Sequence, residues 1–181
     1  MDPLTILITG AAGFIGTNLT KKLLSLGYRV IGVDNFYSGS PENIRLFDNN
    51  LRYKFIKHDV RRPLKVKEKI DEIYNLACPA SPPIYQKDPL FTLNTSVLGI
   101  KNILQLAKEN RAKILHASTS EIYGNPIEHP QKESYWGNVN TIGPRRSEIT
   151  YKPLPKDDPI RRKPNIARAK EKTIKYFART S

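Results

Sequence analysis

Short runs of apolar and β-branched residues alternate with longer stretches of helical periodicity along residues 1–118. The first run, Leu4–Thr9, is apolar at almost every position, as expected of a strand that is buried on both faces of a sheet. The four similar runs that follow are residues 29–34, 53–57, 72–77 and 113–118. The two stretches with apolar residues near helical spacing are residues 14–26 and 89–110. This alternation predicts a parallel sheet with crossover helices.

The expected fold class is therefore α/β, a Rossmann-type parallel sheet of about five strands in the order 3-2-1-4-5. Periodicity disappears from Tyr123 to Pro164, and a helix-like pattern returns only at about residues 165–179. We therefore expect two parts. Residues 1–143 form a Rossmann-type domain, and residues 144–181 form a basic C-terminal segment that ends in a helix.

Positive charge is concentrated in that C-terminal segment. The chain has a formal net charge of +13, and residues 144–181 carry 12 Lys and Arg against 4 Asp and Glu, with a single leucine. Such a composition cannot build a hydrophobic core of its own. The segment lacks the interleaved aromatic residues of a single-strand binder and any helix-turn-helix, zinc-finger or RNA-binding signature. A solvated basic surface is the favoured interpretation, with no nucleic-acid partner.

Other functional classes are disfavoured by what the sequence lacks. Cys78 is the single cysteine, which excludes an intramolecular disulfide framework and points to a reducing compartment. His58 and His116 are expected to be structural and His129 to lie in a loop, so no metal site is expected. No stretch approaches the roughly 18 continuous apolar residues that span a bilayer, and no targeting signal is evident. We expect a cytoplasmic protein without membrane contact.

A glycine-rich turn is the strongest single motif. Gly10, Gly13 and Gly16 are spaced G-x-x-G-x-x-G between the first predicted strand and the first predicted helix, where free N–H groups favour an anion such as pyrophosphate. Asp34 ends the second predicted strand 21 residues after Gly13. A carboxylate there can accept both hydroxyls of an adenosine ribose and repel a 2′-phosphate. NAD is therefore favoured over NADP as cofactor; the alternative is a glycine turn that serves packing alone.

Six segments in order carry a more specific resemblance. They are residues 9–16 (TGAAGFIG), 34–39 (DNFYSG), 58–60 (HDV), 76–83 (LACPASPP), 118–124 (STSEIYG) and 135–140 (YWGNVN). Together they resemble the extended short-chain dehydrogenase/reductase superfamily of NAD-dependent epimerases and dehydratases, and within it the UDP-glucuronate decarboxylases (UDP-xylose synthases). Residues 1–145 resemble that family almost without a gap, and residues 147–171 resemble a segment near its C-terminus. The stretch between them in the family is absent, which implies an internal deletion and an incomplete substrate lobe.

The resemblance implies an NAD site built from three groups of residues. The pyrophosphate group is Gly10, Gly13, Phe14, Ile15 and Gly16. The adenosine group is Asp34, Asn35, Tyr37, Ser38 and Gly39, with Asp59 and Val60 beside the adenine. The nicotinamide group is Leu76, Ala77, Cys78, Thr95 and Ala117. Asp59, at the end of a predicted strand, is also compatible with the alternative of a helix or turn cap.

Three positions depart from the family pattern. Cys78 replaces an expected Ser, and a small buried thiol is favoured over a redox role. Asn94 stands where the family has a Lys near the sugar nucleotide, and Ser96 stands where it has Asn. The last two changes lower the affinity for substrate that the resemblance would otherwise imply.

The reaction implied by the resemblance is that of a carboxy-lyase that converts UDP-glucuronate to UDP-xylose and CO2. NAD+ takes hydride from C4, the 4-keto acid loses CO2, and the same NADH reduces the ketone. Thr119 would bond the C4 oxygen, while Ser120 and Glu121 would act around the carboxylate. The same run also fits a strand end with capping hydroxyl groups.

The Tyr-x-x-x-Lys pair that supplies the base in this superfamily is missing. Among nine tyrosines, only Tyr53 has a lysine four residues later, Lys57, and this pair lies in a predicted strand, where such residues do not stack on one helical turn. The family's tyrosine position holds Glu148. General-base help of roughly 10²- to 10⁴-fold is therefore lost.

Two hypotheses follow. The chain is either an impaired enzyme of the UDP-glucuronate decarboxylase type or a catalytically inactive NAD-binding remnant that associates with an intact relative. The missing stretch also leaves the fifth strand as an exposed edge, so we expect association into a homo-oligomer or with such a relative.

Overall fold

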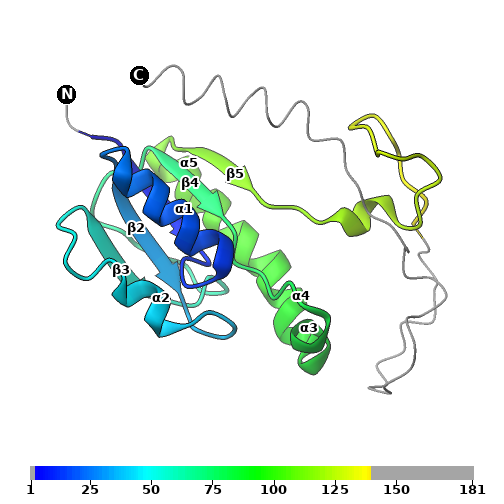
Figure 1. Ribbon diagram of the computed structural model, residues 1–181, viewed down its shortest axis with the longest axis horizontal. Coiled ribbons are helices and arrows are strands. Elements are labelled where there is room, and N and C mark those ends of the chain that lie inside the picture. The colour runs from blue at the N-terminus through cyan, green and yellow to red at the C-terminus, as the bar shows by residue number, and fades with distance from the viewer. Residues whose placement is uncertain (1–2, 140–181) are drawn as a thin grey trace. The chain divides into compact units, whose positions relative to one another are not determined.

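The computed structural model describes residues 3–139, and the five predicted strands form one parallel sheet (Figure 1). The strands are β1 (Thr5–Thr9), β2 (Arg29–Asp34), β3 (Tyr53–Lys57), β4 (Glu72–Asn75) and β5 (Lys113–His116). Their order is β3-β2-β1-β4-β5, which confirms the predicted α/β fold and strand order. β4 and β5 each end two residues earlier than predicted.

The helices differ more from the sequence prediction than the strands do. They are α1 (Phe14–Ser25), α2 (Pro41–Arg45), α3 (Pro82–Lys87), α4 (Pro89–Asn94) and α5 (Ile100–Asn110), with a π-helical segment, η1 (Thr95–Gly99), between the last two. The single helix predicted over residues 89–110 is thus interrupted by a π-helical turn, a feature that often lies at functional sites. The short helices α2 and α3 were not predicted, because five or six residues are too few to show helical periodicity.

The core lies on both faces of the sheet. Along β1, Ile6 and Ile8 pack on one face with Leu23 of α1, while Leu7 packs on the other face with Ile103 of α5. All five side chains are completely buried. Figure 1 shows α1 and α5 on opposite sides of the sheet. Burying each of these side chains contributes about 1.5–3 kcal/mol to the free energy of folding. This packing stabilises the sheet, whose carboxyl end carries the site described below.

A buried polar network joins the carboxyl ends of the central strands. The Thr9 hydroxyl donates to Asn75 Oδ1 (2.5 Å) and accepts from the backbone N–H groups of Leu76 (3.1 Å) and Ala77 (3.2 Å). The Asn75 amide nitrogen also lies 3.0 Å from His116 Nδ1. The Thr9 side chain thus positions the backbone of Leu76 and Ala77, which follow β4.

Replacing Thr9 by Val should lower the free energy of unfolding by about 1–3 kcal/mol, because the Ala77 N–H and the Asn75 carbonyl lose a buried partner, while the Leu76 N–H keeps only the Thr9 carbonyl (3.2 Å). Thr20→Val in α1 is the matched control. Its hydroxyl is equally buried but has no hydrogen-bond partner, so this change should be neutral or stabilising. Urea unfolding of both variants measures the difference; equal destabilisation by both would contradict the role given to Thr9.

β5 is one of the two edge strands of the sheet within the described residues, and β3 is the other. Leu115, in this strand, is 53% exposed. This agrees with the exposed edge expected from the sequence.

The chain divides into two compact units, Met1–Ala117 and Ser118–Ser181. The described part of the second unit begins with a 3₁₀ helix, η2 (Ser120–Tyr123). The loop that follows is held by two backbone hydrogen bonds, from Asn125 N–H to the Asn138 carbonyl (3.0 Å) and from Asn138 N–H to the Tyr123 carbonyl (2.9 Å). The boundary expected after Gly143 and the helix expected at residues 165–179 lie outside the described residues.

Candidate functional site

The turn between β1 and α1 leaves no room for side chains at two of its glycines. Gly10 has φ +72°, and a Cβ there would lie 2.9 Å from the Leu76 carbonyl carbon. A Cβ at Gly16 would lie 2.8 Å from the Ala11 Cα. The N-cap of α1, Gly13, offers no side chain to the first-turn amides. The turn therefore brings bare backbone and a helix N-terminus to the same place, an arrangement that favours an anion.

Asp34 connects this turn to the end of β2. The residue is 9% exposed, and its carboxylate accepts from Ala12 N–H at Oδ2 (2.9 Å) and from Phe36 N–H at Oδ1 (2.8 Å). Each carboxylate oxygen has capacity for a second donor. Asp34 can therefore fix the turn and still accept hydroxyl groups from a ligand.

A groove that is open to solvent runs along this end of the sheet. From the predicted pyrophosphate group it is lined by Gly10 and Gly13. From the adenosine group it is lined by Asp34, Asn35, Tyr37, Ser38, Gly39 and Val60. From the nicotinamide group it is lined by Leu76, Ala77, Cys78 and Thr95. The structure thus brings twelve of the seventeen predicted cofactor residues to one groove.

The other five predicted cofactor residues lie around the groove but do not line it. Phe14 and Ile15 are exposed at the start of α1, and Gly16 packs against the turn. Ala117 donates its N–H to the Asn75 carbonyl (3.1 Å), and Asp59 is bound by Arg61.

Phe91 is a groove residue that the sequence reasoning missed, together with Val33, His58 and Pro79. Its ring stacks on that of Tyr37, with centroids 3.9 Å apart. Asp88 caps α4 by accepting from Phe91 N–H (2.9 Å), and this cap holds Phe91 at the groove. The Asp-Pro sequence that starts α4 was a visible signal for the helix, but not for the stack.

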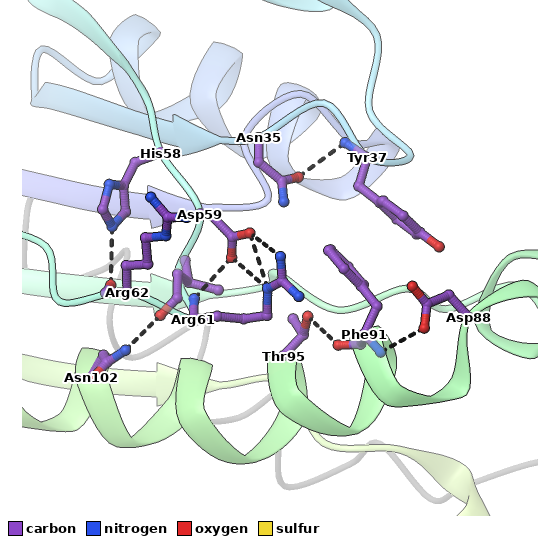
Figure 2. A network of polar contacts seen from close by, with 11 residues as sticks. Asn35, Tyr37, His58, Asp59, Arg61, Arg62, Asp88, Phe91, Thr95 and Asn102 are labelled. Carbon is purple, nitrogen blue, oxygen red and sulfur yellow. Dashed lines mark hydrogen bonds and ion pairs between the residues drawn. The ribbon is translucent and has the colours of Figure 1, made fainter.

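Asp59 acts as a turn cap, the alternative that the sequence left open. Its Oδ1 accepts from the Arg61 backbone N–H (3.0 Å), while the Arg61 side chain pairs with both carboxylate oxygens (Figure 2). The hydrogen bonds from Arg61 lower the pKa of Asp59. Asp59 is therefore ionised at neutral pH.

The predicted nicotinamide end contains Cys78 and the π-helical segment. Cys78 is exposed, with its Sγ 3.5 Å from Ser96 Oγ, so the expectation of a buried thiol was wrong. Thr95 is buried and donates its hydroxyl to the Phe91 carbonyl (2.8 Å), which leaves its oxygen lone pairs for other donors. Asn94 is exposed.

The three predicted catalytic residues open the second unit. Thr119 is the N-cap of η2, and its hydroxyl accepts from Glu121 N–H (3.2 Å). This is the capping role that the sequence left as the alternative for this run. The catalytic roles of Thr119, Ser120 and Glu121 stay predictions.

Tyr53 does not have the properties of a base. Its hydroxyl is buried without a hydrogen-bond partner, and burial, followed by the charge of Asp34, raises its pKa. A catalytic tyrosine needs a lower pKa. Over residues 3–139 there is also no cluster of three His, Cys, Asp or Glu side chains suited to a metal, and no helix that could cross a membrane.

Known proteins agree with this architecture. Residues 7–144 match the family model described as GDP-mannose 4,6 dehydratase. Among solved structures, a UDP-galactose 4-epimerase superposes with a TM-score of 0.66 at 28% identity, covering 75% of this chain and 45% of that one. DesIV, a dTDP-glucose 4,6-dehydratase from Streptomyces venezuelae solved with NAD bound, superposes with a TM-score of 0.66 at 26% identity. The match covers 76% of this chain and 46% of DesIV.

Curated sequence relatives are more similar still. UDP-glucuronic acid decarboxylase 1 of Arabidopsis thaliana is 51% identical over 142 residues, 78% of this chain and 32% of the relative. UDP-glucuronic acid decarboxylase 1 of Danio rerio is 50% identical over 144 residues, which are 80% of this chain and 34% of the relative. The chain thus spans about a third of the length of these relatives.

The sheet order, the glycine turn and the groove define a Rossmann-type α/β protein. The chain belongs to the extended short-chain dehydrogenase/reductase superfamily of NAD-dependent epimerases and dehydratases, which confirms the family predicted from the sequence.

Proposed function

We propose that this chain binds NAD in the groove, with the pyrophosphate at the N-terminus of α1 and the adenosine ribose on Asp34. The observation that carries the proposal is the position of the Asp34 carboxylate, hydrogen-bonded to the same turn whose glycines leave bare backbone for a phosphate. A superfamily member of the same fold was solved with NAD bound. The bare backbone of the turn suits the pyrophosphate and the Asp34 carboxylate suits the ribose, so the residues present fit the cofactor.

Each part of the groove has a task in this proposal. The turn and the first amides of α1 hold the pyrophosphate. Asp34 orients the ribose and excludes a 2′-phosphate by charge repulsion. Leu76, Ala77 and Thr95 wall the nicotinamide end. NAD, when bound, supplies reversible hydride transfer.

We propose further that the chain is of the UDP-glucuronate decarboxylase type but impaired in turnover. Relatives about 50% identical carry that name, so UDP-glucuronate is the proposed substrate. The one tyrosine with a lysine four residues later, Tyr53, lies in strand β3 with its hydroxyl buried, so it is not placed to take the proton from a sugar hydroxyl. The exposed edge of β5 supports association with another copy or with an intact relative.

Isothermal titration with NAD and NADP tests the cofactor proposal. NAD should bind at least about tenfold more tightly than NADP, since a 2′-phosphate would face the Asp34 carboxylate. Asp34→Ala should weaken NAD binding by about tenfold to a hundredfold, the loss expected for hydrogen bonds to a charged group.

Asp48→Ala is the matched control, because it removes the same charge from an exposed position that does not line the groove. It should leave NAD affinity unchanged. Circular dichroism checks that Asp34→Ala stays folded, since this variant also loses two hydrogen bonds from backbone N–H groups. Equal binding of NADP and NAD by the unmodified chain would refute the proposal.

A further inference from the structure

Two aromatic side chains connect opposite walls of the groove. Tyr37 lies in the segment that follows β2, and Phe91 lies in α4, which comes after β4 and α3. Because β2 and β4 pair with opposite edges of β1, these segments lie on either side of the glycine turn that ends β1. The two rings are stacked, with centroids 3.9 Å apart and an angle of 13° between their planes. Both residues line the groove, so its walls touch at this point.

Backbone hydrogen bonds hold Tyr37 on the first wall. Its N–H donates to Asn35 Oδ1 (2.9 Å), and the preceding N–H, that of Phe36, donates to Asp34 Oδ1 (2.8 Å). Two consecutive turns of this kind fix the path of the chain after β2. Tyr37 is 37% exposed, so its ring is not enclosed by the core and can rotate without breaking these backbone bonds.

Phe91 is supported on the second wall by two other contacts. Its N–H donates to the Asp88 carboxylate, which caps α4 (2.9 Å). The Arg61 guanidinium lies 4.1 Å from the centre of its ring, a cation–π contact. Figure 2 shows the Phe91 ring between the Tyr37 ring and the Arg61 guanidinium. Arg61 is in turn paired with Asp59 after β3, so Phe91 stays oriented towards Tyr37.

The stack closes the groove at this point without filling it. The groove is present while the two rings are in contact, and both residues belong to its lining, so a ligand can lie against the pair. Aromatic stacking and a cation–π contact each favour the closed arrangement by only about two- to tenfold. Exposed side chains also change rotamer within about a nanosecond. The stack is therefore favoured, yet weak enough to open.

We propose that Tyr37 and Phe91 form an aromatic gate, a pair of rings that must separate before a dinucleotide enters or leaves the groove. This inference rests on the proposed binding of NAD. Since the closed stack leaves the groove free, the gate closes in the occupied groove as well as in the empty one. It therefore lowers the rate constants of association and dissociation by the same factor, the fraction of time that it is open, and leaves the dissociation constant nearly unchanged. Arg61 is a positioning residue for Phe91.

Stopped-flow binding of NADH to the full chain tests the gate, because the fluorescence of the reduced nicotinamide reports both rate constants. Phe91→Leu keeps an apolar side chain in the lining but removes the ring. Both rate constants should rise by about threefold to tenfold, while the dissociation constant changes by less than about threefold. Phe91→Tyr keeps a ring and should stay within about twofold of the unmodified chain.

Leu93→Ala is the matched control. It shortens a side chain of the same helix that is 57% exposed and does not line the groove. Both rate constants should stay within about twofold of those of the unmodified chain. Circular dichroism checks that each variant is folded.

The outcomes separate the gate from the proposed function. Unchanged rate constants in folded Phe91→Leu would refute the gate. Faster dissociation alone would mean that Phe91 only contacts the ligand, and faster association alone would mean that the stack obstructs the empty groove; either result refutes the gate and leaves dinucleotide binding intact. Absence of NADH binding by the unmodified chain would refute both. If Phe91→Leu does not fold, Tyr37→Leu removes the other ring and is judged by the same criteria.

Discussion

No sustained UDP-xylose formation is expected when the purified chain is incubated with UDP-glucuronate and NAD+. Hydride removal from a sugar carbon requires that a base take the hydroxyl proton at the same time, and such help is worth roughly 10²- to 10⁴-fold. The sequence contains one tyrosine with a lysine four residues on, Tyr53. That hydroxyl is buried in β3, and its pKa is raised. The rate should fall by at least the general-base factor.

Release of CO2 and formation of UDP-xylose measure this directly, with an intact UDP-glucuronate decarboxylase assayed in parallel. NADH absorbance should also stay at baseline, because the missing base blocks the first step rather than decarboxylation. Product formed over many turnovers by the chain alone would contradict this prediction. NAD binding is measured separately, so an inactive but correctly folded protein is recognised as such.

Gly16→Ala should destabilise the protein by about 1–3 kcal/mol or more and weaken NAD binding by at least about tenfold. A Cβ at this position meets backbone rather than a flexible side chain, including the Ala11 Cα at 2.8 Å and the Gly10 carbonyl carbon at 2.9 Å. Either α1 or the turn must shift, and both belong to the proposed pyrophosphate site. Urea unfolding measures the stability, and titration with NAD measures the affinity.

Asn18→Ala on the same helix is the control for this substitution. Asn18 is exposed, and its amide only bonds back to the Phe14 carbonyl (2.9 Å). Its replacement should change stability by no more than about 0.5 kcal/mol and leave NAD binding intact. If Gly16→Ala behaved like Asn18→Ala, the close approach of helix and turn would not matter for binding.

The sheet was predictable because its strands carry local signals. β1 is buried along its whole length and mostly apolar, as expected of a strand with both faces covered. Once five such runs are found, the right-handed crossovers of a Rossmann-type sheet give the strand order. The glycine turn and Asp34 were predictable for a similar reason. Their spacing places them at the ends of adjacent parallel strands, whatever the details of the loops.

The features that the sequence did not reveal depend on contacts between distant segments. Phe91 carries the periodicity of an ordinary helical residue, and nothing near it indicates a stack on Tyr37. Asp59 and Arg61 are two residues apart, yet their pairing is favoured by Phe91, which supports the guanidinium from another element. The π-helical segment η1 is only five residues long, so its spacing of apolar residues cannot be told from that of an α-helix in the sequence.

The position of β1 in the middle of the sheet also affects how the chain comes together. Thr9 pairs with Val33 on one side but with Asn75 on the other, so half of its neighbours are 66 residues away in the sequence. The entropy of closing that loop must be overcome before the pairing gives any stability. During synthesis we therefore expect one edge of β1 to stay unpaired until β4 has left the ribosome, so chains stalled before that point should be the most prone to aggregation.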